Sequence, residues 1–295
     1  MRALLTLMPL LLACDRSLEI DRPLPEKDPT TAWKALLESA ARPDGVNYTL
    51  IETNREVLQD YLRWIGEKGP NATAVRESNE DKRIAMLVNA YNAWVIEGVL
   101  RNQPLASVLD VSFGPYAMRP GMSFFVGQQI RVDKDWTNLY RLEVHSILNR
   151  YQEPMLHITL NCASKGCPPL RYWPERGLQT AMSRAWRSWL SSDKALRKEG
   201  DGWAANEIFY WYEDDFLDWT DAITLFDWMA GYTGDERGQW MRAHAEDCPL
   251  GRFEYDWSLN AVAADAPGIA PLDPIEEGPV DEGPAEVPGD EDEGF

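Results

Sequence analysis

The residues best suited to chemistry stand in the segment 157–170, which reads HITLNCASKGCPPL. Ile158, Thr159 and Leu160 favour a strand, and the small and polar residues that follow favour a turn. A strand that ends in a turn presents Cys162 at the mouth of a loop, where a substrate can reach it. The segment therefore predicts Cys162 as a nucleophile. The alternative is a buried structural cysteine or half of a disulfide.

A nucleophilic cysteine needs an imidazole within hydrogen-bond reach, and the chain has three histidines. On a regular strand, His157 would lie on the opposite face from Cys162 and roughly 16 Å away, at about 3.3 Å per residue. His244 has no other chemical signal near it. His145 stands in a predicted helix over residues 138–149 that can pack over the end of the strand. We therefore predict His145 as the partner of Cys162.

The strongest helical pattern covers residues 80–100, which are apolar almost all round and predict a central helix. Asn89 and Asn92 interrupt this surface one turn apart, and a buried asparagine must find partners. Two readings stay open. The asparagines tie neighbouring loops together, or one of them orients a catalytic imidazole or donates to an oxyanion. The predicted site is thus Cys162 and His145, with Asn92 and Asn89.

The N-terminus predicts export and lipidation. Arg2 precedes an apolar run of about ten residues, which is too short to span a bilayer and typical of a signal peptide over residues 1–13. The residues LLAC at 11–14 resemble a bacterial lipobox, in which the signal is cut before the cysteine and Cys14 is lipidated. An ordinary signal peptide is the alternative. We expect a lipidated tether over residues 14–30 and a protein anchored to a cell-envelope membrane, facing outside the cytoplasm.

The cysteine count leaves the disulfide pairing open. The cysteines are Cys14, Cys162, Cys167 and Cys248. If Cys14 carries lipid, an odd number remains in an oxidising compartment. A Cys167–Cys248 bond would leave Cys162 free, whereas a Cys162–Cys167 bond would remove the proposed nucleophile.

The C-terminal segment 262–295 is rich in Pro, Gly, Asp and Glu. It carries eleven acidic residues and no Lys or Arg, in a chain of net charge −19. We predict a disordered acidic tail, because such a segment buries too little apolar surface to offset its ordering entropy. The acidic balance argues against nucleic-acid binding. A membrane contact through Cys14 and an unidentified protein partner remain as expected partners.

The remaining residues, 31–261, are enough for one large domain. The alternation of helical and strand patterns predicts an α+β fold, a single mostly helical domain packed on a small β-sheet. We expect that sheet to include residues 158–161, and further strands over 124–132 and 255–260. No cofactor is predicted, because no glycine-rich phosphate loop occurs. No metal site is predicted, because no histidine pair has ligand spacing, although Cys162, Cys167, His157 and His145 are zinc ligands by type.

Several pieces of sequence, taken in order, resemble one family, the bacterial and plant proteins catalogued as domain of unknown function 547. These pieces are NAYNA at 89–93, HSIL at 145–148, the block HITLNCASKGCPPL, WY at 211–212 with DF at 215–216, and YDWSLN at 255–260. The resemblance runs over roughly residues 33–260 and implies no established activity. The family usually has a glutamate directly before the histidine that matches His145. Here Val144 stands at that position and Glu143 lies one residue earlier.

Two functions follow from these patterns. The first is a cysteine-dependent hydrolase or acyl-transferase that acts on peptides or amides in the cell envelope. The second is a non-catalytic envelope lipoprotein whose aromatic-rich surface binds a protein or a glycan.

Overall fold

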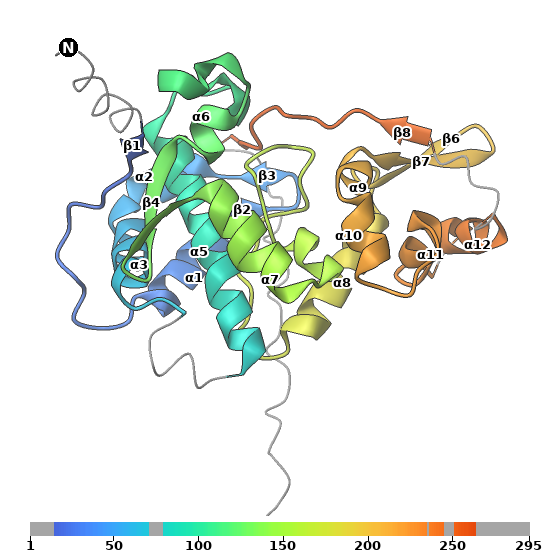
Figure 1. Cartoon of the computed structure of the whole chain (residues 1–295), viewed down its shortest axis with the longest axis horizontal. Coiled ribbons are helices and arrows are strands. Elements are labelled where there is room, and N and C mark those ends of the chain that lie inside the picture. Colours follow the sequence, from blue (N-terminus) through green and yellow to red (C-terminus); the bar gives the residue numbers. More distant parts are fainter. Residues whose placement is uncertain (1–14, 71–78, 235, 245–250, 264–295) are drawn as a thin grey trace, which may run out of the picture.

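The structure is a computed structural model that describes residues 15–70, 79–234, 236–244 and 251–263. It confirms the predicted α+β class, with one group of helices around α5 (Glu80–Arg101), a second group of helices over residues 208–243 beside it, and strands in small sheets (Figure 1). The predicted signal peptide, Cys14, Cys248 and the acidic tail beyond residue 263 lie outside the described residues. Among the residues described, no helix has both the length and the apolar character needed to cross a bilayer.

The helices follow the chain as short and medium segments. The α-helices are α1 (Thr30–Ala40), α2 (Tyr48–Thr53), α3 (Arg55–Glu67), α5 (Glu80–Arg101), α6 (Met122–Phe125), α7 (Asn149–Tyr151), α8 (Leu178–Leu190), α9 (Ile208–Trp211), α10 (Glu213–Asp218), α11 (Leu225–Ala230) and α12 (Glu236–Ala243). The 3-10 helices are Val108–Asp110, Gly114–Met118 and Pro154–Ile158, and Arg141–Leu148 is a π-helix.

Helix α5 is the centre of the fold, as its apolar pattern predicts. The Asn79 side chain accepts a hydrogen bond from the Lys82 amide and caps its first turn, and every residue from 87 to 100 is buried. The helices α1, α2 and α3 lie on one side of α5, and α8 and the π-helix lie on the other (Figure 1). Because α5 is covered all round, any polar side chain on it must bond to a neighbouring segment.

The strands form three small sheets. Strand β4 (Gln128–Val132) pairs in parallel with β1 (Arg16–Ser17) and antiparallel with β5 (Asp135–Asn138). Strands β2 (Ala41–Arg42) and β3 (Gly45–Val46) form a short antiparallel pair. Strand β7 (Gly202–Asn206) pairs antiparallel with β6 (Leu196–Glu199) and in parallel with β8 (Gly251–Phe253). The pairing of β1 and the full burial of Leu18 show that part of the predicted tether packs against the body.

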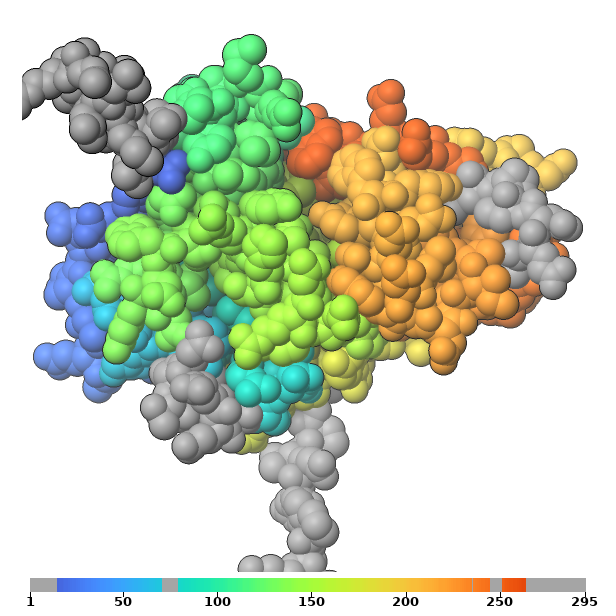
Figure 2. All heavy atoms as spheres, in the orientation of Figure 1, coloured from blue at the N-terminus to red at the C-terminus, as the bar shows by residue number. Residues whose placement is uncertain are grey.

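The segment after β8 connects the two ends of the described body. It leaves the sheet of β6, β7 and β8 and runs across to β3, where Ala261 bridges to Val46 (Figure 1). In the space-filling view this red segment lies between the green and orange parts of the molecule (Figure 2). The predicted strand over 255–260 is therefore mostly extended coil, with an isolated bridge between Leu259 and Ser164.

The predicted strand over 158–161 is wrong. Residues Pro154–Ile158 form a 3-10 helix, which Glu153 caps by accepting a hydrogen bond from the Met155 amide. The Thr159 amide then donates to the Leu156 carbonyl, which continues the turn. Proline at the first helical position and an acidic cap favour this geometry over an extended strand. The turn removes the reason for excluding His157, because side chains no longer alternate between two faces.

Asn92 and Asn89 of α5 hold the segment that follows this turn. Asn92 donates to the Thr159 carbonyl at 2.8 Å and accepts from the Asn161 amide at 3.0 Å. Asn89 makes the same pair of bonds to the backbone of Trp173, at 2.8 and 2.9 Å. Both side chains are buried. Each one supplies a donor and an acceptor to backbone groups that a neighbouring strand would otherwise have to satisfy. We call this pair of contacts the asparagine clamp.

We expect Asn92→Ala to destabilise the protein by about 2 kcal/mol, because the buried amide of Asn161 loses its acceptor. Urea unfolding followed by tryptophan fluorescence measures this change. The control is Asn149→Ala, which alters an exposed asparagine and should change stability by less than about 0.5 kcal/mol. Equal small effects of the two substitutions would contradict the clamp.

Candidate active site

The segment 161–168, which we call the cysteine loop, is closed by Asn161. The Asn161 side chain donates to the Pro168 carbonyl at 2.8 Å and accepts from the Ala163 amide at 2.9 Å. Ala163 has a φ of 64°, in the left-handed region that a non-glycine residue rarely adopts. The loop is thus held in a tight, specific shape by a residue that the clamp itself fixes.

This shape brings two free thiols together. The Sγ atoms of Cys162 and Cys167 lie 2.8 Å apart, and the Cys162 amide donates to the Cys167 sulfur at 3.1 Å. Cys162 is half-buried, whereas Cys167 is buried. Cys162, the residue that the sequence predicts as the nucleophile, is therefore the more exposed of the two cysteines.

Tyr255 and Ser164 complete what we call the thiol cluster. The Tyr255 hydroxyl lies 3.1 Å from the Cys162 sulfur, 2.9 Å from the Cys167 sulfur and 3.2 Å from the Ser164 hydroxyl. The Ser164 hydroxyl lies 2.8 Å from the Cys162 sulfur. Gly166 permits this approach, because a Cβ atom there would stand 2.8 Å from the Tyr255 ring. Local sequence pattern gives no signal for Tyr255 at this site, because it approaches from residues 254–261 after β8, which we call the crossing segment.

The surroundings of the thiol cluster shift the pKa values of the two thiols in opposite directions. Burial raises the pKa of the Cys162 thiol well above its ordinary value, and the neighbouring Cys167 sulfur raises it further. Burial alone would also raise the pKa of Cys167. The hydrogen bonds from Cys162, Tyr255 and two backbone amides outweigh burial and lower that pKa to about 7. Within this pair, held at an S···S distance of 2.8 Å, the thiolate therefore forms more readily on Cys167 than on Cys162.

Both sulfurs line a cavity of about 300 Å³, which we call the thiol pocket. Most of its wall is aromatic or aliphatic. The lining includes Tyr91, Leu109, Met122, Phe125, Tyr140, Leu160, Ile208, Trp211, Tyr212 and Trp257. Its polar groups are few: the two thiols, Glu143, His157 and the tyrosine hydroxyls. A largely apolar pocket with a small set of convergent polar groups is the usual form of a small-molecule or active site.

His157 is the histidine that lines the thiol pocket. Its Nε2 atom lies 2.9 Å from the Asp215 carboxylate, and its ring lies against Tyr212 with centroids 4.2 Å apart. The 3-10 helix directs this buried side chain toward the pocket. A carboxylate that accepts the Nε2 proton fixes the ring and leaves Nδ1 as the basic atom. Asp215 directly precedes the buried Phe216, and local sequence pattern gives no signal that it would hold a histidine.

Glu143 enters the same pocket from the π-helix. Its carboxylate accepts hydrogen bonds from the Tyr91 hydroxyl at 2.6 Å and from the Tyr212 hydroxyl at 3.2 Å. Burial raises its pKa, and these two bonds and the charge of His157 offset only part of the rise. A π-helix has a wider turn than an α-helix and often marks a functional site. The π-helix places Glu143 inside the pocket. Glu143 stands two residues before His145, and Val144 occupies the position directly before that histidine.

His145 itself is exposed on the outer side of the π-helix. Its ring stands edge-on to Tyr140 at 6.0 Å between centroids, and it does not line the thiol pocket. The histidine that the structure brings to the pocket with Cys162 is thus His157. The side chains of Asn89 and Asn92 form hydrogen bonds to the backbone in the asparagine clamp. These bonds agree with the interpretation that the two asparagines tie neighbouring loops together.

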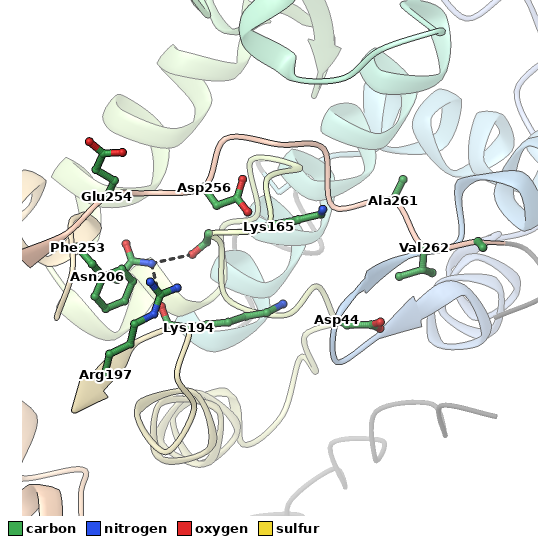
Figure 3. Close-up of a pocket in the computed structure, with 12 residues that line it drawn as sticks. Asp44, Lys165, Lys194, Arg197, Asn206, Phe253, Glu254, Asp256, Ala261 and Val262 are labelled. Atoms are coloured by element: carbon green, nitrogen blue, oxygen red, sulfur yellow. Dashed lines mark hydrogen bonds between the residues drawn. The ribbon is translucent and has the colours of Figure 1, made fainter. Parts of the chain in front are cut away.

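The rear of the cysteine loop faces a second cavity of about 490 Å³ (Figure 3). Here the Asn206 side chain donates to the Gly166 carbonyl at 3.3 Å and to the Lys194 carbonyl at 2.9 Å. Hydrogen bonds from Ser258, and then the charges of Lys165 and Lys194, lower the pKa of Asp256. The loop is therefore supported from behind by β7 and by the crossing segment.

No group of three or more His, Cys, Asp or Glu side chains is arranged to hold a metal ion among the residues that the structure describes. The chemistry that these residues offer is that of a thiol, an imidazole and two carboxyl groups.

We expect Tyr255→Phe to raise the thiolate pKa, because it removes a hydroxyl that donates to the Cys167 sulfur. The pH at which alkylation by iodoacetamide reaches half its maximal rate should rise by about one unit, as one charge-assisted hydrogen bond is lost. Alkylation at neutral pH then slows, because less thiolate is present. The control is Tyr140→Phe, whose ring lines the same pocket. An unchanged pH profile in Tyr255→Phe would show that this hydroxyl does not stabilise the thiolate.

Comparison with known proteins supports the family resemblance over part of the chain. The family model DUF547, described as "Protein of unknown function, DUF547", matches residues 75–190. No curated protein matches the chain, and no solved structure matches it. The matched stretch contains the asparagine clamp, Glu143, His157 and both cysteines of the loop, whereas Tyr212, Asp215 and Tyr255 lie beyond it. The chain thus resembles a family without an assigned function across the central helix and the cysteine loop.

Proposed function

We propose that this protein is a cysteine-dependent hydrolase or acyl-transferase that acts on peptide or amide substrates, with Cys162 as the nucleophile and His157 as its base. One observation carries the proposal: Cys162 and the Asp215-held His157 line the same largely apolar pocket. Nucleophile, base and orienting carboxylate are the parts that thiol acyl transfer requires. His157 replaces His145, the partner that the sequence predicts.

The reaction would proceed in two steps. The Cys162 sulfur attacks the substrate carbonyl carbon, its proton passes to His157, and the carbonyl electron pair moves onto oxygen. The intermediate collapses to a thioester when the C–N bond breaks and the leaving amine takes the proton from the imidazolium. Water, or an acceptor amine or alcohol, then attacks the thioester and releases Cys162.

Three features of the pocket support this assignment. Cys162 is the more accessible thiol, so an acyl group can reach its sulfur, whereas Cys167 is buried. Glu143 has a raised pKa, and a raised pKa makes a carboxyl group better able to hold a proton and supply it to a leaving group. The apolar wall excludes water and strengthens each electrostatic contact.

A second function rests on the aromatic residues of the pocket. Trp211 and Trp257 stack with centroids 5.6 Å apart, and both rings contact Tyr255. Trp211 is partly exposed, and such platforms bind the flat faces of sugars and peptide side chains in many proteins. A non-catalytic envelope module would use this surface without needing a reactive thiol.

A chromogenic acyl ester such as p-nitrophenyl acetate tests the proposed nucleophile and base. We expect wild-type protein to form a thioester on Cys162, which intact-mass measurement detects, and Cys162→Ser to form none. His157→Gln should slow acylation roughly a hundredfold, because the base is lost. The matched control is His145→Gln, which should acylate at the wild-type rate because its ring lies outside the pocket.

The two histidine variants separate the possible outcomes. A loss of acylation in His145→Gln with an unaffected His157→Gln would restore the partner predicted from sequence. Acylation that is equally slow in wild type and Cys162→Ser would contradict catalysis and favour the binding module.

We also propose that Cys14 is lipidated and that the body lies outside the cytoplasm, on the basis of the apolar run and the LLAC match. We expect the Cys14→Ala variant to be lost from the membrane fraction. The control is the Cys248→Ala variant, which changes another cysteine outside the described residues and should remain in the membrane fraction. Fractionation of cells that express each variant measures this. Retention of Cys14→Ala in the membrane would contradict the lipid anchor.

A further inference from the structure

Cys167 is a buried thiol that acyl transfer does not need. A nucleophile and base can work without a second sulfur, yet the Cys167 sulfur lies 2.8 Å from that of Cys162 and accepts hydrogen bonds from Tyr255 and the Cys162 amide. The S···S contact is not much longer than a disulfide bond of about 2.05 Å. Two thiols at this separation need only a small movement to join.

We propose that Cys162 and Cys167 form a redox-active dithiol that closes reversibly to a disulfide by exchange with a small-molecule disulfide. The inference goes beyond the proposed acyl transfer and does not depend on it. It assigns to the second cysteine the role of resolving a mixed disulfide formed on the first.

The exchange balances as two successive displacements. The Cys162 thiol gives its proton to the Cys167 sulfur and attacks one sulfur of the small disulfide, which breaks its S–S bond and releases a thiolate. That thiolate takes the proton from Cys167. The Cys167 thiolate then attacks the Cys162 sulfur and expels the second small thiolate, which takes a proton from water. The protein dithiol loses two electrons in total, and one small disulfide becomes two small thiols.

The charge distribution at the loop favours these steps. The accessible sulfur of Cys162 faces the thiol pocket, so an external disulfide reaches it first. The neighbouring sulfur is held close to the thiolate form by the Tyr255 hydroxyl, at 2.9 Å. A thiolate already in contact with the mixed disulfide is an efficient resolving group.

The loop is built to be stable in the reduced state. Asn161 bonds to Pro168 and Ala163, and Asn206 bonds to the Gly166 carbonyl from behind (Figure 3). A disulfide between residues so close in sequence closes a very short loop, so it removes little entropy from the unfolded chain. The disulfide therefore contributes little to the stability of the fold. Its formation and reduction mainly change the chemistry of the site.

Oxidation would also have a consequence for the acyl transfer, which rests on the proposed function. The disulfide occupies the Cys162 sulfur, so an oxidised protein cannot form the thioester. The thiol pocket would then be active under reducing conditions alone.

The test equilibrates the full chain with mixtures of reduced and oxidised glutathione, followed by alkylation and peptide mapping. Cleavage after Lys165 separates the two cysteines, so a disulfide joins two peptides that are otherwise distinct. We expect wild type to lose both thiols reversibly. Cys248→Ser should behave in the same way. Cys167→Ser should stop at a stable mixed disulfide between glutathione and Cys162, because the resolving sulfur is absent.

Three results would overturn the proposal: two thiols that stay reduced across the whole series, a bond from either cysteine to Cys248, or a disulfide that resists excess reductant. If Cys167→Ser fails to fold, the reversible loss of thiols in the wild type decides the question by itself. His157→Gln should form the disulfide as wild type does. Because His157→Gln slows acylation and leaves disulfide formation unchanged, failure of the dithiol proposal can be told apart from failure of the acyl-transfer proposal.

Discussion

The hydrogen bonds between Asn92 and the backbone at Thr159 and Asn161 are the contacts on which the site depends. They connect the most buried helix of the fold to the start of the cysteine loop. The Asn161 side chain then closes the cysteine loop by bonding to Pro168 and Ala163, and this closure positions both sulfurs. An asparagine costs helix propensity in the middle of α5, and a buried amide must be fully bonded to be tolerated. Its presence there is explained by the loop that it holds.

A second constraint is the removal of water from the thiols. Burial by itself would keep both cysteines neutral, because a thiolate loses its solvation in an apolar pocket. At Cys167, the short contact with the Cys162 sulfur and the Tyr255 hydroxyl compensate for this loss. The same enclosed environment holds Glu143 against Tyr91 and Tyr212 and holds His157 against Asp215. The thiols, Glu143 and His157 thus all have hydrogen-bond partners within the site, which is the arrangement expected of a preorganised site.

The sequence predicts the central helix and the loop well, because both depend on local pattern. The apolar residues from 84 to 100 leave little choice but a buried helix, and the turn after Leu160 places Cys162 where the structure has it. The predicted strand over 158–161 differs from the structure, because Glu153 and Pro154 begin a helical turn there. With this turn, His157 no longer lies on the face opposite Cys162.

Other parts of the site could not be reached from local pattern. Tyr255 lies 88 residues after Cys167, and its place beside the sulfurs depends on the path of the crossing segment. The π-helix alters which residues of 141–148 face inward, so Glu143 enters the pocket and His145 does not. Such wide turns have no reliable signature in a single sequence, because they are stabilised by tertiary packing.

The central claim is that Cys162 and His157 act on one substrate within the thiol pocket. A crystal structure of the protein after reaction with a peptide chloromethyl ketone tests it most directly. The predicted result is a covalent bond to the Cys162 sulfur, with the ligand lying in the pocket between Tyr91 and Trp211 and with His157 within hydrogen-bond reach of its carbonyl group. A bond to Cys167, or a ligand beside His145 on the outer surface, would contradict the claim.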